Sequence, residues 1–243
     1  MTGGHSGAKP GRAVSSRVVL ALDLPSLDPA RALALAVKSA VGMLKVGLEL
    51  YVEAGPGAVG LGRETGLPVF LDLKLHDIPA TVERAVGRAS ALGARMLTVH
   101  GSGGRAMLKR AVERARKEGA GLEIVAVTVL TSFDANDLAD TGVAADVPSQ
   151  VERLARMAWG EGVRAFVCSP HEASRLRTTL GAEATLITPG VRAASDAGKD
   201  DQKRTMSAGE AVAAGASWVV VGRPIRDAAD PLAAARAFTR EAT

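Results

Sequence analysis

The chain has 243 residues, of which 47% are hydrophobic, 23% are charged and 3% are aromatic, and its formal net charge is +4. This is the balance of a globular protein with a substantial core, and so few aromatic residues argue against a stacking surface for single-stranded nucleic acid. The single cysteine, Cys168, excludes an intrachain disulfide and a cysteine zinc cluster, and it suits the reducing cytoplasm in which we expect the protein to work.

The N-terminal stretch, residues 1–17, is small and polar and lacks the apolar run of a signal peptide. We therefore expect a flexible N-terminal segment over 1–17, followed by one catalytic domain over 18–243. No apolar run reaches the length of a membrane span, and the positive charges are scattered among acidic residues. The sequence thus predicts neither a membrane nor a nucleic acid partner, and it favours an anionic small molecule.

From residue 18 onward, short apolar runs alternate with longer Ala-rich stretches of helical period. The predicted strands are 18–23, 43–47, 68–74, 95–100, 123–130, 163–168, 185–188 and 217–222. Most of these runs are continuously apolar, as expected for a parallel sheet that is buried on both faces. Eight such units, nearly all followed by a helical stretch, predict one α/β domain with the (β/α)₈ TIM-barrel fold. An open doubly wound sheet is the alternative.

The most informative segment is FLDLKLHDIP, residues 70–79, in which a strand that should be buried carries Asp72 and Lys74 and then releases Asp77. Side chains alternate across a strand, so Asp72 and Lys74 are predicted to face the same side. Burying charges is costly, so the pair is either a structural ion pair or a catalytic array. We favour the catalytic array, because active sites of (β/α)₈ barrels lie at the C-terminal ends of the strands.

Other polar residues follow the ends of the remaining predicted strands. They are Asp23, Lys45, His100, Thr131, Ser132, Cys168, Ser169, Thr188, Arg192, Gly222 and Arg223. After the seventh and eighth strands, TPGVR (188–192) and VGRPI (221–225) offer glycine backbone and arginine, which suits a phosphate group. The four histidines are scattered, which argues against a zinc site, and Cys168 has no readable base beside it, so we interpret it as a small buried residue.

The motifs DLKLHDIP, ALD with Asp23, LKVG with Lys45, TPGVR and VGRPI together resemble the orotidine 5'-phosphate decarboxylase family over residues 18–238. The resemblance implies a single (β/α)₈ barrel of the ribulose-phosphate-binding type that acts without metal or other cofactor. It also implies conversion of orotidine 5'-monophosphate (OMP) to UMP and carbon dioxide, the last step of de novo UMP synthesis. Two positions depart from the family pattern: Ala80 stands where Asn is usual, and Ala193 stands where Pro is frequent.

The resemblance also implies residue roles. Lys45, Asp72, Lys74 and Asp77 match the charged catalytic network, in which Lys74 protonates the product carbanion. Asp77 would come from the partner subunit of a homodimer, and Thr81 matches a second contact made across that interface.

The substrate-binding positions follow in the same way. Asp23 matches the residue that holds the ribose hydroxyls, and Thr131 matches a contact near the base. Lys45 and Asp72 are expected to contact the substrate as well. The phosphate positions are matched by Arg192, Gln202, Gly222 and Arg223.

Two rivals remain open. A metal-assisted sugar-phosphate decarboxylase or aldolase shares D-x-K-x-x-D, but typically carries an acidic residue near the position of Lys45, where a lysine would repel magnesium. A silent barrel that only binds a nucleotide would be favoured by loss of Asp72 or Lys74, and both are present.

Overall fold

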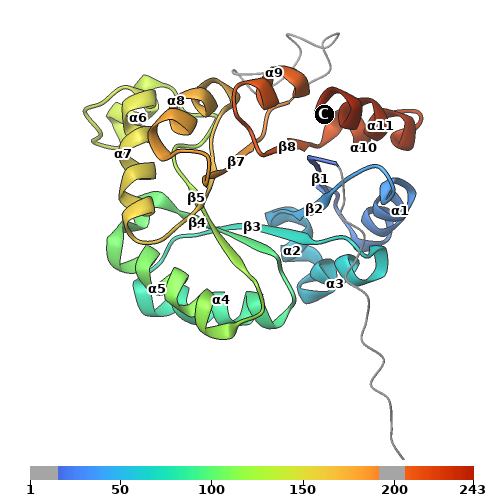
Figure 1. The fold of residues 1–243 in the computed structure, drawn as a ribbon. Helices are drawn as coiled ribbons and strands as arrows, with labels where there is room; N and C mark the ends of the chain where they lie inside the picture. Colours follow the sequence, from blue (N-terminus) through green and yellow to red (C-terminus); the bar gives the residue numbers. More distant parts are fainter. Residues whose placement is uncertain (1–15, 192–205) are drawn as a thin grey trace, which may run out of the picture.

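A computed structural model describes residues 16–191 and 206–243 of the chain. Eight parallel strands pair in chain order and close into a barrel, with helices around the outside (Figure 1). The predicted (β/α)₈ barrel is therefore confirmed, and the open doubly wound sheet is wrong. The strands are β1 (Val18–Ala21), β2 (Met43–Val46), β3 (Val69–Leu75), β4 (Met96–His100), β5 (Glu123–Val127), β6 (Ala165–Val167), β7 (Thr185–Thr188) and β8 (Trp218–Val221).

The helices follow the strands as the sequence pattern predicts. They are α1 (Leu27–Val37), α2 (Leu48–Ala54), α3 (Pro56–Thr65), α4 (Pro79–Ala91), the 3₁₀ turn η1 (Gly101–Gly103), α5 (Gly104–Glu118), α6 (Ala135–Asp140), α7 (Val147–Gly160), α8 (Pro170–Leu180), α9 (Ala208–Ala213), α10 (Arg223–Arg226) and α11 (Pro231–Glu241). Several begin at a side-chain cap; Ser169, for example, caps α8 in a reciprocal capping box with Glu172. Within the described ranges, no helix is long and apolar enough to cross a membrane.

The fifth strand is shorter than predicted. β5 ends at Val127, whereas the apolar pattern extended it to Leu130. The Thr128 hydroxyl donates to the carbonyl of Val167 on β6, at 3.1 Å, where a regular strand would continue the backbone ladder. The chain then leaves the sheet, so that Val129, Leu130 and Thr131 line a cavity at the mouth of the barrel.

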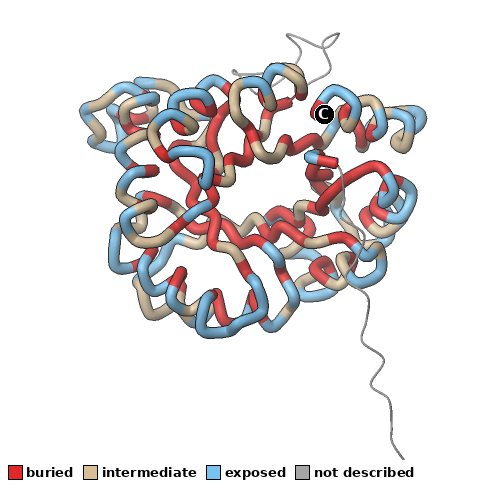
Figure 2. The backbone as a smooth tube through the Cα atoms, in the orientation of Figure 1, coloured by how far each residue is buried: buried red, intermediate tan, exposed pale blue. Residues whose placement is uncertain are grey.

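The core has two layers. Between strands and helices lies a large apolar layer, and a smaller cluster fills the barrel interior; Figure 2 shows the buried residues concentrated along the strands. The interior cluster comprises Val19, Ala21, Met43, Phe70, Met96, Val125, Ala165, Ile187 and Val220. Cys168 is fully buried in the outer layer, as predicted.

The two-residue period of the strands determines where the polar groups point. Val19 and Ala21 face the interior, so the next residue on that side of β1 is Asp23. In the same way, Lys45 follows Met43 on β2, and Asp72 follows Phe70 on β3. Since all strands run in the same direction, these charged side chains lie together at one end of the barrel, above the interior apolar cluster.

The start of the described chain is held against the barrel. Ser16 is buried, and its hydroxyl lies 2.8 Å from that of Thr239 on α11. The carbonyl of Arg17 accepts the N–H of Val219 on β8. Ser16 and Arg17, which we assigned to the N-terminal segment, thus pack on the domain, while residues 1–15 lie outside the described part.

Candidate active site

A cavity of about 420 Å³ opens at the C-terminal ends of the strands. Apolar residues of the barrel interior form part of its wall, and charged side chains share the space. The lining residues are Ala21, Asp23, Lys45, Phe70, Asp72, Lys74, Val127, Val129, Leu130, Thr131, Val167, Ile187, Pro189, Gly190, Val220, Gly222, Arg223 and Arg226. The structure therefore brings together seven of the predicted site residues, from Asp23 to Arg223.

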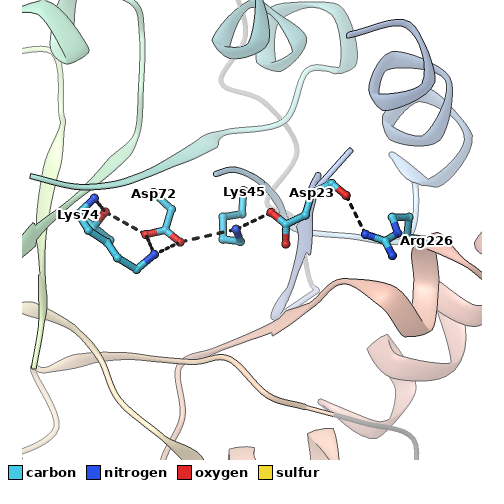
Figure 3. Close-up of polar contacts among 6 residues, drawn as sticks. Asp23, Lys45, Asp72, Lys74 and Arg226 are labelled. Carbon is cyan, nitrogen blue, oxygen red and sulfur yellow. Dashed lines mark hydrogen bonds and ion pairs between the residues drawn. The ribbon is translucent and has the colours of Figure 1, made fainter. Parts of the chain in front are cut away.

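Four of these residues form a continuous chain of alternating charges (Figure 3). Lys45 Nζ lies 3.0 Å from Asp23 Oδ1 and 3.6 Å from Asp72 Oδ2. Lys74 Nζ lies 2.9 and 3.0 Å from the two oxygens of Asp72. The same-side placement of Asp72 and Lys74 is thus confirmed, and each of these four charges has an opposite charge beside it.

The two central charges of this row, Lys45 and Asp72, are largely buried, and their pKa values are shifted. The side chains of Lys45 and Asp72 are only 11% and 13% exposed. Burial opposes ionisation of Lys45, but the carboxylates of Asp72 and Asp23 outweigh it, and the pKa of Lys45 is raised. Burial likewise opposes charge on Asp72, yet Lys45, Lys74 and a hydrogen bond from Thr98 hold its pKa below the ordinary value. Both groups therefore remain charged at neutral pH.

The strand that carries Asp72 and Lys74 is irregular at this point. The pairing of β3 with β4 runs from Leu71 opposite Leu97 directly to Leu75 opposite Val99. Lys74 has a φ of +49°, and among the described residues it is the sole non-glycine with a positive φ. Such backbone costs on the order of 1–3 kcal/mol and persists where surrounding contacts hold it. Alternation alone did not predict this distortion.

Two predicted site residues lie away from the cavity. Asp77 is exposed, and its carboxylate accepts the N–H of Ile78 at 2.6 Å. Thr81, on α4, accepts a hydrogen bond from Arg84 at 3.3 Å. Within the described part of one chain, neither residue reaches the cavity. Arg192 and Gln202, predicted for the phosphate site, lie outside the described residues.

Arg226, on α10, was missed by the sequence analysis. Its guanidinium donates to the carbonyl of Asp23 at 2.7 Å (Figure 3). It also forms a two-pronged ion pair with Asp227 at 2.6 and 2.8 Å. It therefore ties the loop after β8 to the end of β1. The only available signal was a second arginine three residues after Arg223, which cannot reveal a contact made across the barrel closure.

Gly47 was quoted only as part of a motif, but it has a geometric role. A Cβ atom at this position would lie 3.0 Å from Asp23 Oδ1 and 3.1 Å from Lys45 Nζ. The lack of a side chain thus leaves room for the Asp23–Lys45 ion pair.

Two histidines lie beside the site. The rings of His76 and His100 stack with their centroids 5.2 Å apart. Burial, together with the charges of His76 and Lys74, lowers the pKa of His100. His100 was predicted near the site from its place at the end of a strand, but no local pattern indicated its contact with His76.

The donor set does not resemble a metal site. In the described ranges, no group of three or more His, Cys, Asp or Glu residues is arranged to hold an ion. The two carboxylates that share the cavity, Asp23 and Asp72, both contact the ammonium of Lys45. A divalent cation between these carboxylates would have to displace that ammonium.

Comparison with known proteins shows which family the chain resembles. A model of the "Orotidine 5'-phosphate decarboxylase / HUMPS family" matches residues 16–238. An orotidine 5'-phosphate decarboxylase of Anaeromyxobacter sp. (strain K) is 52% identical over 224 residues, which cover 92% of this chain and 97% of the relative. One from Chromohalobacter salexigens is 46% identical and covers 92% of this chain and 94% of the relative.

A solved structure agrees with these relatives. The orotidine 5'-phosphate decarboxylase of Lactobacillus acidophilus superposes with a TM-score of 0.81 at 32% identity, covering 94% of this chain and 99% of that one. The range matched by the family model, 16–238, includes all eight strands of the barrel. The chain therefore belongs to the orotidine 5'-phosphate decarboxylase / HUMPS family.

Proposed function

We propose that this protein decarboxylates OMP to UMP in pyrimidine biosynthesis, with Lys74 as the proton donor. The relatives named orotidine 5'-phosphate decarboxylase support the reaction, since the chain covers nearly their whole length. The observation that carries the assignment of Lys74 is its position: the ammonium lies in the cavity, held 2.9 Å from the buried carboxylate of Asp72.

The chemistry requires a stabiliser for a localised electron pair. When the bond between C6 and the carboxylate breaks, carbon dioxide leaves and the pair stays on C6 in the plane of the ring, where the π system delocalises it poorly. The Lys74 ammonium stabilises that charge and then transfers a proton to C6. The resulting amine regains a proton from water, so atoms and charge balance.

Asp72 has two roles in this account. It holds Lys74 in place, and it lies near the position of the substrate carboxylate. Two like charges about 4 Å apart repel by roughly 4 kcal/mol at an effective dielectric constant of 20, and departure of carbon dioxide relieves this repulsion. Transition-state stabilisation by Lys74 is the larger part of the proposal, because ground-state destabilisation is a contested mechanism.

The remaining cavity residues suit the rest of the nucleotide. Asp23, at the end of β1, would bind the ribose hydroxyls, and Thr131 would contact the base. Gly222 precedes α10 and Arg223 begins it, where a phosphate can accept hydrogen bonds from backbone N–H groups and from the guanidinium. Binding of the phosphate supplies free energy that orients the substrate at the distant reacting end of the site. Arg192 and Gln202 join this phosphate site on the resemblance alone.

Arg226 provides the first test of this arrangement. We expect Arg226→Ala to raise KM for OMP roughly tenfold with a smaller effect on kcat, because Asp23 loses a charge-assisted hydrogen bond that fixes its backbone. Steady-state kinetics measure the effect, and Arg236→Ala, on α11, is the matched control. An unchanged KM would show that the contact to Asp23 does not matter for ribose binding.

A homodimer would complete the site with Asp77 and Thr81. Both lie outside the cavity of their own chain, near Ile78, which is 66% exposed. On α2, which follows the neighbouring strand β2, Val52 is 81% exposed. Exposed large apolar side chains such as these are expected where a second copy packs.

Mixing two impaired variants tests this dimer. We expect Lys74→Ala and Asp77→Ala to be weakly active alone but to recover up to about a quarter of wild-type activity after subunit exchange. The reason is that one of the two sites in each mixed dimer then has an intact Lys74 and an intact Asp77 from its neighbour. Sedimentation checks that both variants remain dimers. Failure to recover activity from exchanged dimers would place Asp77 outside the neighbour's site.

The substrate is tested by product identification. Purified protein is offered OMP and, separately, a phosphorylated keto-sugar acid with magnesium, and the products are identified by mass spectrometry. Formation of UMP from OMP, with no decarboxylation of the sugar acid, supports the proposal. Decarboxylation of the sugar acid would favour the metal-assisted rival, and tight UMP binding without turnover would favour the silent binder.

A further inference from the structure

We propose that Thr98, on β4, is a positioning residue that holds the Asp72–Lys74 pair in its reactive geometry. Thr98 is fully buried and does not line the cavity, so it would act through these two residues and not on the substrate. The inference rests on the proposed decarboxylase activity, and it adds a residue that none of the sequence motifs includes.

The first support is the irregular pairing of β3 and β4. Between the pairs Leu71–Leu97 and Leu75–Val99, β3 has three residues, 72 to 74, and β4 has only Thr98. Such an excess is a β-bulge, which breaks the ladder locally and re-aims side chains. It leaves backbone groups of β3 in need of other partners, because buried N–H groups are nearly always paired.

The Thr98 side chain supplies one such partner. The backbone N–H of Lys74 donates to Thr98 Oγ1 at 2.7 Å. Lys74 is the residue whose φ of +49° is unfavourable for an amino acid with a Cβ atom. The hydroxyl oxygen therefore holds the backbone of Lys74 in the conformation from which its side chain enters the cavity.

The hydroxyl proton makes the second contact. Because Thr98 Oγ1 accepts from Lys74, its proton is free to be donated to Asp72 Oδ1, which lies 3.0 Å away. A carboxylate can only accept, so the direction of this bond is fixed. Lys74 is then tied to Asp72 twice: its Nζ donates directly, and its backbone N–H is linked through Thr98.

This closed ring of hydrogen bonds distinguishes positioning from simple packing. A packing role needs only the volume and the β-branched shape of threonine, which valine reproduces. The positioning role needs the hydroxyl, which serine retains and valine lacks. The hydroxyl also joins the charges of Lys45 and Lys74, the two cations facing Asp72, in keeping the Asp72 pKa low against the effect of burial.

The test compares Thr98→Val with Thr98→Ser. For Thr98→Val we expect kcat for OMP to fall on the order of 10- to 100-fold, the effect of losing a hydrogen bond to a charged group, with KM within about threefold of wild type. We expect Thr98→Ser to keep kcat within about threefold. The acid limb of the kcat–pH profile should move to higher pH in the valine variant only.

Three results would overturn the inference while leaving the proposed function intact. The first is a Thr98→Val variant with the kcat and the pH profile of wild type. The second is equal impairment of the serine and valine variants. The third is a crystal structure of Thr98→Val in which Lys74 keeps its positive φ and its bond to Asp72. That structure also tests the inference independently of turnover. If wild type itself fails to decarboxylate OMP, the proposed function is wrong, and the crystal structure alone decides whether Thr98 positions the pair. If Thr98→Val does not fold, Thr98→Ala and Thr98→Ser make the same comparison with and without the hydroxyl.

Discussion

Replacing Lys74 by alanine is expected to lower kcat for OMP decarboxylation by at least about 10⁴-fold. General acid catalysis contributes about 10²–10⁴-fold, and an electrostatic stabiliser of developing charge contributes about 10²–10³-fold more. Lys74 is assigned both roles, and the ammonium of Lys45, another cation of the site, is already paired with Asp23 and Asp72. Single-turnover measurement with excess enzyme gives the residual rate.

Lys109→Ala is the matched control for this variant. Lys109 lies on α5, its side chain is 64% exposed, and it makes a 4.0 Å ion pair with Glu113. Such surface pairs contribute little, so activity and stability should both stay near wild type. If Lys74→Ala kept a rate within tenfold of this control, another group would have to be the proton donor.

Replacing Asp72 by asparagine is expected to have the second-largest effect. The change keeps the shape but removes the negative charge between two ammonium groups, which lie 3.6 Å (Lys45) and 2.9 Å (Lys74) from the carboxylate. We expect kcat/KM to fall about 10²–10³-fold, because Lys74 loses the partner that orients it. We also expect the free energy of unfolding to fall by about 3 kcal/mol, near the low end for a broken buried pair because Lys45 keeps Asp23.

The stability part of this prediction depends on pH in a defined direction. The folded-state pKa of Asp72 lies below its ordinary value of 3.8. Its contribution is therefore fully present above that value and is lost as the pH falls through the folded-state pKa. The difference in unfolding free energy between wild type and Asp72→Asn should be constant near neutral pH and should shrink below pH 3.8. Denaturant unfolding across pH measures it.

Asp28→Asn is the control for Asp72→Asn. Asp28 pairs with Arg31 on the surface of α1, and its side chain is 94% exposed. This pair should contribute under about 1 kcal/mol at any pH. If the two variants had equal stability, or if the Asp72 effect grew as the pH fell, the ionised state assigned to Asp72 would be wrong.

The fold and half of the site followed from local sequence patterns. The apolar runs predicted all eight strands, and the two-residue period of a strand accounts for the position of Asp23, Lys45 and Asp72 above the apolar interior. These features depend on residues close together in the chain, where alternation and turn signals act. The end of β5 was misplaced because Thr128 leaves the ladder through its side chain, which an apolar pattern does not reveal.

The missed features depend on contacts between distant segments. Thr98 acts through a bulge that exists only in the register of β3 against β4. Arg226 meets Asp23 across 203 residues of chain. Asp77 and Thr81 remain predictions from resemblance, since their proposed partner is a second copy of the chain.

The most direct test of the central claim, a decarboxylation driven by fixed charges with no metal, is the OMP turnover rate after exhaustive dialysis against EDTA. The protein is assayed in chelator by the loss of OMP ultraviolet absorbance, beside Lys74→Ala. We expect an unchanged wild-type rate in chelator and a rate at least about 10⁴-fold lower for the variant. A wild-type rate that disappears with EDTA and returns with magnesium would contradict the central claim.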